Sequence, residues 1–497
     1  ADKMRPGMVL FSVVVLFLCV GILTPKEMLE GFSNKGMITV ALLFLVSEGI
    51  RQSGTLGQVI KKLLPQGKTT VFKAQLRILP SVAFISAFLN NTPVVVIFAP
   101  IIKHWAKSVK LPATKFLIPL SYVTILGGIC TLIGTSTNLV VHGMILEAGY
   151  EGFTMFELGK VGIFIAIAGI IYLFIFSKRL LPDARPDTAV PDEEVEEGEK
   201  LHRVEAVLGA RFPGINKKLS DFNFQRHYGA EVKEIKTRNG QRYVDHLEDV
   251  VLREGDTLVV MADDTFIPTW GESSVFVLLT NGNDPDTSGK KKRWLALILL
   301  VLMIVGATVG ELPATKEMFP DIKLDMFFFV CITTIIMAWT NIFPARKYTK
   351  YISWDILITI ACAFAISKAM VNSGVADCVA GFIIGLSDDY GPHVLLAILF
   401  VITNLFTELI TNNAAAALAF PLALSISAQL GVSPTPFFVV ICMAASASFS
   451  TPIGYQTNLI VQGIGNYKFT DFVRIGLPLN IITFLISVIL IPLIWNF

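Results

Sequence analysis

Two short runs of amide and hydroxyl side chains interrupt stretches of the chain that are otherwise apolar. Each run has a hydroxyl one helical turn before it, Ser86 before the first and Thr407 before the second,. Asparagine and threonine oxygens, together with backbone carbonyls, are suitable ligands for a small hard cation such as sodium. These residues therefore indicate a binding site rather than a catalytic centre. The two runs are Asn90-Asn91-Thr92 and Thr411-Asn412-Asn413.

Two further polar segments contain glycine and also interrupt apolar helices. A helix that ends inside a membrane exposes backbone groups: N–H groups at its start favour anions, and carbonyl groups at its end favour sodium. Hydrogen bonding between helices would explain one such segment, but four related segments favour a ligand site. The segments are Gly134-Thr135-Ser136-Thr137-Asn138 and Gly454-Tyr455-Gln456-Thr457-Asn458.

The segments that contain these polar runs have almost no charged residues. No Lys, Arg, Asp or Glu occurs in residues 80–100 or 116–146, and residues 396–424 contain only Glu408. A divalent anion buried there would have no fixed counter-charge, and burying an unpaired anion is strongly unfavourable. We therefore expect cations to accompany the anion, and sodium rather than protons.

The composition indicates a membrane setting for these segments. Of the 497 residues, 53% are hydrophobic and 16% are charged, and the mean hydropathy is +0.64, whereas a soluble chain of this length would need more polar surface,. The net charge of +2 gives no support for a nucleic-acid partner,. Uncharged apolar runs about long enough to cross a lipid bilayer recur at 8–23, 161–176, 294–310, 326–340 and 475–497,.

A constant offset of 320 to 321 residues relates the two halves of the chain. It aligns the two asparagine-rich runs with each other and the two glycine-containing segments with each other. By the positive-inside rule, the basic loops near 51–77, 178–179, 290–293 and 346–350 are expected to be cytoplasmic,. The loop before the first run is then inside and the loop before the second run outside, so the repeats are predicted to be inverted, as in secondary transporters.

We predict a polytopic all-α membrane protein with a small α+β insert on the cytoplasmic side. Two re-entrant hairpins are expected at 77–103 and 396–424, and two broken helices at 127–138 and 446–458,. The expected domains are a first membrane repeat over 1–181, the insert over 182–290 and a second membrane repeat over 291–497. The chain would be a multi-pass protein of the cell membrane.

The polar segments resemble those of the divalent anion:sodium symporter family, whose marks are paired Ser-Asn-Thr hairpin tips and Gly-Thr-Pro-Pro-Asn-like breaks. The similarity covers essentially every membrane segment. It implies a homodimer that works by an elevator motion, with two or more sodium ions and no organic cofactor. It also implies that Asn91 and Asn412 contact both sodium and substrate. The sodium ligands implied by the resemblance are Ser86, Asn90, Asn91, Gly134, Thr407, Thr411, Asn412 and Gly454.

Departures from the family pattern bear on the substrate. Ser136-Thr137 and Gln456-Thr457 stand where the dicarboxylate carriers of the family have two prolines, so these positions gain hydrogen-bond donors,. Extra donors suit a compact tetrahedral oxyanion better than two separated carboxylates, which favours sulfate over succinate or citrate. The expected substrate-binding residues are Asn90, Asn91, Thr92, Ser136, Thr137, Thr411, Asn412, Asn413, Gln456 and Thr457.

The expected function is therefore sodium-coupled symport of sulfate or a similar divalent anion, and the main alternative is a sodium-coupled dicarboxylate or citrate transporter. An ion antiporter of related fold would want buried acids where this chain has Asn and Thr. A channel would need a filter such as TVGYG, which the sequence lacks,. An enzyme is not expected, because no metal-binding His/Cys cluster, nucleophile elbow or phosphate loop occurs,.

The insert alternates short strand-like runs with turns, as at 230–235 and 257–261,. From Leu219 to Asp256 it resembles the C-terminal subdomain of potassium-channel regulatory domains (RCK C), here as one copy over about 203–265. Such subdomains accompany sulfate-permease-like members of the family. A packing or dimerisation role is favoured over ligand sensing.

The offset leaves one apolar helix without a counterpart. Segment 326–340 pairs with 8–23, but the image of 294–310 would precede residue 1. Because an inverted duplication supplies equal numbers of helices, we expect at least one helix either to precede this sequence or to have been lost from the first repeat.

Overall fold

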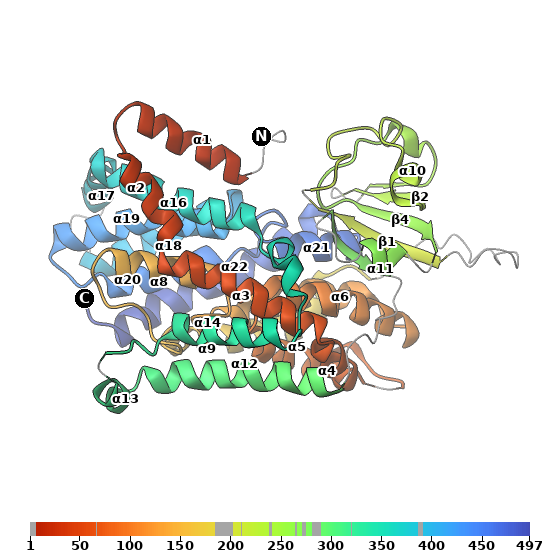
Figure 1. Cartoon of the computed structure of the whole chain (residues 1–497), viewed down its shortest axis with the longest axis horizontal. Coiled ribbons are helices and arrows are strands. Elements are labelled where there is room, and N and C mark those ends of the chain that lie inside the picture. The colour runs from red at the N-terminus through yellow and green to blue at the C-terminus, as the bar shows by residue number, and fades with distance from the viewer. Residues whose placement is uncertain are drawn as a thin grey trace, which may run out of the picture.

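The structure, a computed structural model, is mostly helical, with one small sheet set beside the helices (Figure 1). The chain enters the sheet after its first helical half and leaves it for a second helical half. The residues that the structure describes are 6–65, 67–183, 202–209, 211–237, 241–263, 266–270, 275–280, 290–319, 321–385 and 391–497.

Polar side chains cap the starts of some helices in the first half. Asn34 caps α3 by accepting a hydrogen bond from the Gly36 N–H, and Thr70 caps α5 in the same way from Lys73,. The elements are α1 (Pro6–Cys19), α2 (Pro25–Glu30), η1 (Gly31–Ser33), α3 (Lys35–Gln52), α4 (Thr55–Leu63), α5 (Val71–Ser86), α6 (Asn91–Ser108), η2 (Ala113–Lys115), α7 (Leu117–Gly128), α8 (Ser136–Glu147) and α9 (Gly159–Leu180).

The second half repeats this order of long helices and breaks. The breaks fall at residues 410–411 and 447–455, at the expected polar segments. The elements are α12 (Lys290–Gly310), α13 (Pro313–Met318), α14 (Met326–Trp339), η4 (Ala345–Lys347), α15 (Tyr348–Tyr351), α16 (Trp354–Asn372), α17 (Val375–Gly385), α18 (Gly391–Leu409), α19 (Asn412–Leu430), α20 (Thr435–Ser446), α21 (Gln456–Gly465) and α22 (Phe469–Ile494).

The insert forms a five-stranded sheet in the order β3-β2-β4-β1-β5, in which every neighbouring pair is antiparallel. The two strands expected at 230–235 and 257–261 are confirmed as β2 and β4. The elements are β1 (His202–Leu208), α10 (Phe224–Tyr228), β2 (Glu231–Lys236), β3 (Arg242–Tyr243), η3 (Leu247–Asp249), β4 (Thr257–Ala262), α11 (Phe266–Trp270) and β5 (Phe276–Thr280).

Seven described helices are long and apolar enough to cross a membrane,. Two of them carry exposed apolar ridges at a four-residue spacing, Ile163, Ile167 and Ile171 on α9 and Ile481 and Leu485 on α22,. Such surfaces suit lipid rather than water. The expectation of a multi-pass, mostly helical membrane protein is confirmed. The seven are Pro25–Gln52, Gly159–Leu180, Lys291–Gly310, Trp354–Asn372, Gly391–Leu409, Asn412–Leu430 and Phe469–Ile494.

The sequence offset reappears in the packing of the helices. α5 packs on α7 as α18 packs on α20, α6 packs on α21 as α19 packs on α8, and α1 packs on α16 as α14 packs on α3. α9 and α22, which correspond to each other, also lie in contact. α12 packs on α14 and α3, and the expected counterpart of α12 stays a prediction.

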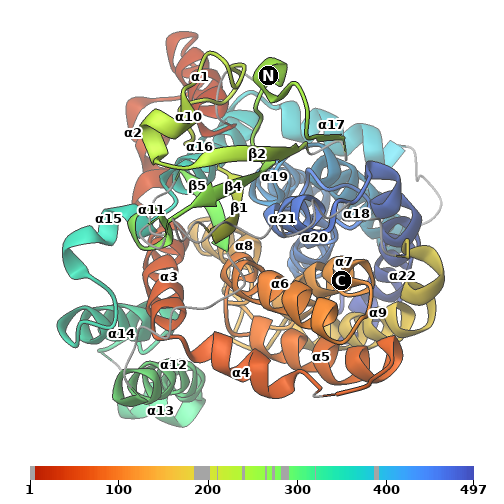
Figure 2. The ribbon, with the colours of Figure 1, turned by 90° about the vertical axis from the view of Figure 1, so that its right-hand side faces the viewer.

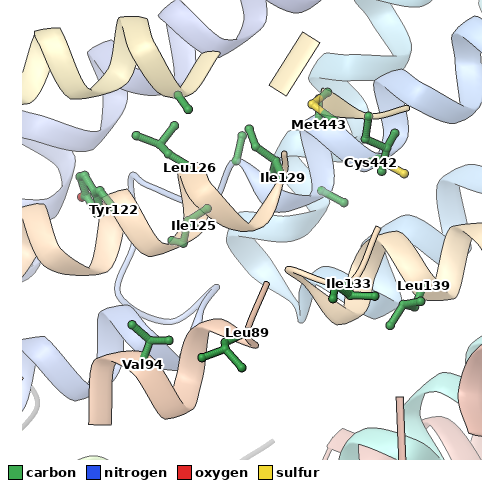
Figure 3. Packing of buried hydrophobic residues seen from close by; sticks show 14 of the residues in the cluster. Leu89, Val94, Tyr122, Ile125, Leu126, Ile129, Ile133, Leu139, Cys442 and Met443 are labelled. Atoms are coloured by element: carbon green, nitrogen blue, oxygen red, sulfur yellow. The ribbon is translucent and has the colours of Figure 1, made fainter. Parts of the chain in front are cut away.

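The helices around the breaks share one apolar core, in which Leu89, Tyr122, Ile133, Cys442 and Met443 come from both halves of the chain (Figure 3). Close backbone approach makes this packing possible. A Cβ at Gly127 of α7 would lie 2.1 Å from the Ala83 carbonyl oxygen of α5. Only glycine allows these two helices to meet at that point.

Candidate functional site

The two asparagine-rich runs have the same internal geometry. Ser86 Oγ donates a hydrogen bond to Asn91 Oδ1 at 2.8 Å, and Thr407 Oγ1 lies 2.8 Å from Asn412 Oδ1. Ser86 is the last residue of α5, Thr407 lies two residues before the end of α18, and the two asparagines begin the next helices, so each contact closes the turn between two helices. Both asparagines and both hydroxyl residues are buried. The structure therefore brings these four predicted residues together in two equivalent pairs.

The loops between α7 and α8 and between α20 and α21 are also built alike. The Gly134 N–H donates to Thr131 Oγ1 at 3.2 Å, and Gly454 N–H to Thr451 Oγ1 at 3.3 Å. The amide of an asparagine in the following helix then donates to the backbone carbonyl of the same threonine, at 2.9 and 3.1 Å. These two asparagines are Asn138 and Asn458.

The Tyr455 hydroxyl connects the first asparagine-rich run to the glycine-containing loops. The sequence alone did not predict it as a site residue. It accepts a hydrogen bond from Asn91 Nδ2 at 2.6 Å and lies 3.0 Å from Thr135 Oγ1. Its position in the polar segment, opposite Thr135 at the 320-residue offset, is the signal that could have identified it.

Further contacts link the remaining predicted residues in pairs across the repeats. Ser136 and Thr137 donate to Asn413 Oδ1 at 3.2 and 3.3 Å, and Thr92 donates to Gln456 Oε1 at 3.4 Å. These contacts lie directly at the first residues of the helices. Thr411 instead caps its own helix, accepting from the Ala414 N–H.

Other predicted or nearby residues lie slightly apart from these pairs. Asn90 lines a cavity of about 10 Å³ together with Ser136 and apolar residues of α3 and α12, and that volume holds about one water molecule. Thr457 lies 2.9 Å from the hydroxyl of Ser121, which also donates to Asn458 Oδ1 at 2.7 Å. Ser121, in the middle of α7, gave no signal in the sequence.

Four helices begin at this place: α6 at Asn91, α8 at Ser136, α19 at Asn412 and α21 at Gln456. The first N–H groups of a helix have no partner within the helix, and they carry partial positive charge. The contacts described above hold the four helix starts against one another. Such a convergence of helix starts can hold an anion without any Lys or Arg.

Several backbone and side-chain oxygen atoms lie close together near Asn91 and near Asn412. A Cβ at Gly134 would lie 2.6 Å from the Gly128 carbonyl oxygen and 2.9 Å from that of Ala87, and one at Gly454 would lie 2.6 Å from the Thr407 carbonyl oxygen. The single hydroxyl proton of Thr407 has two acceptors, Asn412 Oδ1 at 2.8 Å and the Ala445 carbonyl at 2.6 Å. Oxygens that outnumber protons favour a small cation.

Unpaired oxygens support the same conclusion. Among the described residues, the buried Ser446 Oγ, Ser448 Oγ and Asn138 Oδ1 have no hydrogen-bond partner. Ser448 Oγ lies next to Gly454, where a Cβ would be only 2.0 Å from it. Buried polar atoms without partners are rare, because leaving one unpaired is unfavourable by about 1–3 kcal/mol. Neutral oxygens of this kind fit sodium.

One carboxylate stands beside the second half of the site. Glu408 Oε1 accepts hydrogen bonds at 2.8 Å from the Ser450 N–H and from Asn480 Nδ2 of α22. Its backbone carbonyl accepts from Thr451, as that of Ala87 accepts from Thr131 in the first half. The charge is therefore present in one half only.

A family comparison and three relatives bear on this site. The profile of the citrate transporter family matches residues 1–419 and again residues 318–497. An uncharacterized transporter of Synechocystis is 30% identical over 97% of this chain and 93% of its own length. A probable sodium/sulfate cotransporter of Chlamydomonas reinhardtii is 32% identical over 56% of this chain and 31% of its own length. A sodium-dependent dicarboxylate transporter of Staphylococcus saprophyticus is 25% identical over 29% of this chain and 28% of its own length.

Proposed function

Since the chain belongs to the citrate transporter family, we propose that it is a sodium-coupled symporter of a small divalent anion, with sulfate favoured over dicarboxylates and citrate. The family and the relatives named above are transporters, so the chain is a transporter and not an enzyme. Relatives coupled to sodium support sodium as the coupling ion here.

The observation that carries this proposal is the meeting of four helix starts around the Tyr455 hydroxyl. Asn91 and Thr135 hydrogen-bond to it, and Ser136 donates to Asn413 of α19, so α6, α8, α19 and α21 point their positive ends at one small volume,. A small anion is the ligand that such a place favours. The side chains of Ser136, Thr137, Gln456 and Thr457 add donors at the same helix starts,.

Sodium enters the proposal as a second substrate. The predicted ligands near the first asparagine are Ser86, Asn91 and Gly134, and those near the second are Thr407, Asn412 and Gly454. Each set lies against backbone carbonyls and, in the second, against the unpaired Ser448 hydroxyl. Two cations would balance a divalent anion in a site without Lys or Arg.

Sulfate is favoured because hydroxyl and amide donors replace the prolines of dicarboxylate carriers at residues 136–137 and 456–457. A tetrahedral oxyanion can accept hydrogen bonds on all sides from one compact shell, whereas a dicarboxylate needs two separated groups of donors. The relative named as a sodium/sulfate cotransporter supports this choice, and the relative named as a dicarboxylate transporter keeps the alternative open.

The mechanism in the proposal is an elevator motion built on an inverted repeat with two re-entrant hairpins. Within the group α5–α9 and α18–α22, contacts obey the sequence offset, but the packing on the outer helices does not. Of this group, α3 packs mainly against α8 and less closely against α6, whereas its counterpart α16 packs mainly against α19, the counterpart of α6. Exchanging these two arrangements would move the site relative to α3 and α16. The homodimer implied by the resemblance belongs to the same proposal.

Counterflow in liposomes tests the proposal. Liposomes that contain the purified protein and are loaded with unlabelled sulfate should accumulate labelled sulfate only when sodium is present on both sides of the membrane. Potassium in place of sodium serves as the control, and unlabelled succinate and citrate serve as competitors. Uptake with potassium, or with a pH gradient alone, would contradict sodium coupling. Exchange of succinate without exchange of sulfate would establish the alternative.

The cytoplasmic position of the insert is proposed from the basic residues Arg179 and Lys290 to Arg293 on either side of it,. Glu231 is exposed on β2, so a Glu231→Cys variant can report on its location. In right-side-out vesicles a membrane-impermeant maleimide should label this cysteine only after permeabilisation. The unsubstituted protein gives the background from its native cysteines, and labelling of intact vesicles above that background would reverse the assignment.

A further inference from the structure

The sheet of the insert is covered on both faces. Antiparallel sheets in small modules usually have one packed face and one face in water, but Thr257, Leu258, Val259 and Val260 of β4 are consecutively buried, at 3% exposure or less. Leu258 and Val260 point into the insert's own core, which also contains Val204 and Ile235. Thr257 and Val259 lie on the opposite face.

That opposite face contacts the helices. Val207 of β1, the neighbour of Thr257 in the sheet register, is 1% exposed and belongs to the apolar core of the helices rather than to that of the insert. The views in Figures 1 and 2 place the sheet against α6 and α21. The second face is therefore an internal interface between the insert and the helices.

The contact with α21 is made by a tight turn. Gly255, just before β4, has a φ of 85°, and a Cβ there would lie 3.0 Å from the side chain of Leu459 in α21. One helical turn further on, a Cβ at Gly463 would lie 2.8 Å from Thr257 Oγ1 and 3.2 Å from the Gly255 carbonyl oxygen. Glycine at 255 and at 463 leaves room for the Leu459 and Thr257 side chains, so the turn and the helix can pack closely,.

The contact with α6 is an ion pair. Lys103 Nζ lies 2.9 Å from both carboxylate oxygens of Glu205 in β1, with the two side chains 20% and 17% exposed. Lys236 of β2 lies 3.5 Å from the same carboxylate. Burial raises the pKa of Glu205, but the two ammonium groups outweigh burial and lower it to about 2, so the carboxylate stays charged.

These contacts connect the insert to the two helices whose starts meet at the site. α6 begins at Asn91 and α21 begins at Gln456, next to Tyr455, and the two helices come from different halves of the chain. In the sequence, the insert stands between α9, which packs on α7 and α22, and α12, which packs on α14 and α3. If the site-forming helices α5–α9 and α18–α22 move relative to outer helices such as α3, α12 and α14, the insert must move with one of these two groups.

We propose that the insert is a cross-brace between α6 and α21, which is carried with the site-forming helices during transport and holds the two helices at a fixed separation. The insert contacts α6 at Lys103 and α21 at Leu459 and Gly463, all further along these helices than the site. By holding the two helices there, it limits how far their starts, at Asn91 and next to Tyr455, can separate. The motion in this inference rests on the proposed elevator transport, whereas the docking does not.

Docking is tested without transport. Val207→Lys puts a charge into the buried interface and should lower the melting temperature in detergent by several degrees and expose the insert to trypsin. Glu231→Lys, on an exposed position of the same sheet, is the matched control and should change neither. Lys103→Met and Glu205→Gln should each lower the melting temperature, and the double variant should fall by less than the sum of the two. Additive effects, or a Val207→Lys variant that behaves like the control, would overturn the docking.

Carriage with the moving helices is tested by cross-linking. Cysteines at positions 103 and 205 (K103C and E205C) are joined with a short bismaleimide, and each single variant is the control for the native cysteines. The joined protein should keep sodium-dependent sulfate uptake within about twofold of the unjoined protein, because the brace never has to open. Loss of uptake on joining would mean that the insert must detach, which would overturn the proposal. A wild type that takes up neither sulfate nor a dicarboxylate would refute the proposed function, while melting and proteolysis would still decide the docking.

Discussion

The two halves of the site share the hydrogen bonds that close their turns and loops, and they differ at other side chains. The pairs Ser86–Asn91 and Thr407–Asn412 have the same separation of 2.8 Å, and both glycine loops are closed by a threonine and an asparagine. The differences include Thr135 opposite Tyr455, Ser136 opposite Gln456, and Ala87 opposite Glu408. This division suggests that the shared contacts serve the two cations and that the differing side chains shape the anion site.

A second contrast lies along α6 itself. At its start, near Asn91, the polar groups are neutral and meet other helix ends, whereas further along the helix Lys103 is paired with a carboxylate of the insert. Neutral groups can release a ligand without leaving a buried charge behind, whereas breaking a partly buried ion pair is strongly unfavourable. The neutral groups at the start of α6 therefore favour reversible binding of ligands, whereas the ion pair between Lys103 and the insert favours a contact that stays formed.

The largest effect is expected at the shared contacts. Asn91→Ala and Asn412→Ala each remove an amide that pairs with a hydroxyl of the preceding helix, so each should lower sodium-dependent sulfate uptake by about tenfold or more, and to a similar extent,. Asn372→Ala, which removes an exposed asparagine of α16 that hydrogen-bonds to Ile22 and Glu27 rather than to a site residue, is the control. Uptake is measured with sodium and with potassium. A variant that keeps normal uptake would show that its half does not bind sodium.

A smaller effect is expected where the halves differ around Tyr455. Tyr455→Phe removes the hydroxyl shared by Asn91 and Thr135 and should raise the KM for sulfate about fivefold,. Thr135→Val removes only one of these hydrogen bonds and should raise it about twofold. The two are compared at saturating sodium. Equal effects, or a larger effect of Thr135→Val, would mean that Tyr455 does not organise the helix starts.

The lone carboxylate gives a further test of the asymmetry. Glu408→Gln keeps an oxygen that can accept from Ser450 and Asn480 but removes the negative charge near the second cation position. The sodium concentration for half-maximal uptake should rise about threefold, because a nearby negative charge favours a bound cation. Glu157→Gln, in the same membrane part, is the control. Superimposable sodium curves for the variant and wild type would remove Glu408 from the cation site.

The smallest effect is expected at the ion pair between Lys103 of α6 and Glu205 of the insert. The pKa of Glu205 is lowered to about 2 by Lys103 and Lys236 despite burial, so its contribution to stability is complete above its ordinary pKa and is lost only as the pH falls from about 4.5 towards 2. The melting temperatures of wild type and Glu205→Gln should therefore differ by a constant amount between pH 5.5 and 8. A difference that shrinks within that range would show that the carboxylate is not held by these two lysines.

Local sequence patterns predicted the elements of the site well. Asparagine, glycine and proline interrupt apolar runs at 90–93, 134–138, 411–413 and 452–458, and the helices begin and end there. The physical reason is local, since an apolar run without charges forms a helix in a membrane and a polar segment with glycine ends it. The resemblance to sodium-coupled divalent anion transporters is likewise confirmed at the level of the family.

The grouping of side chains depended on contacts between distant segments. Nothing in the local pattern placed the Tyr455 hydroxyl beside Asn91, or Ser121 of α7 beside Asn458, because these residues are more than 330 positions apart. The same holds for the insert, whose alternating strands predicted a sheet but not the cover over its second face. Packing of α6 and α21 against each other decided both, since it brings two helix starts to one point and offers one surface to the sheet. Helix ends are set by neighbouring residues along the chain, whereas the site they form is set by which helices pack together.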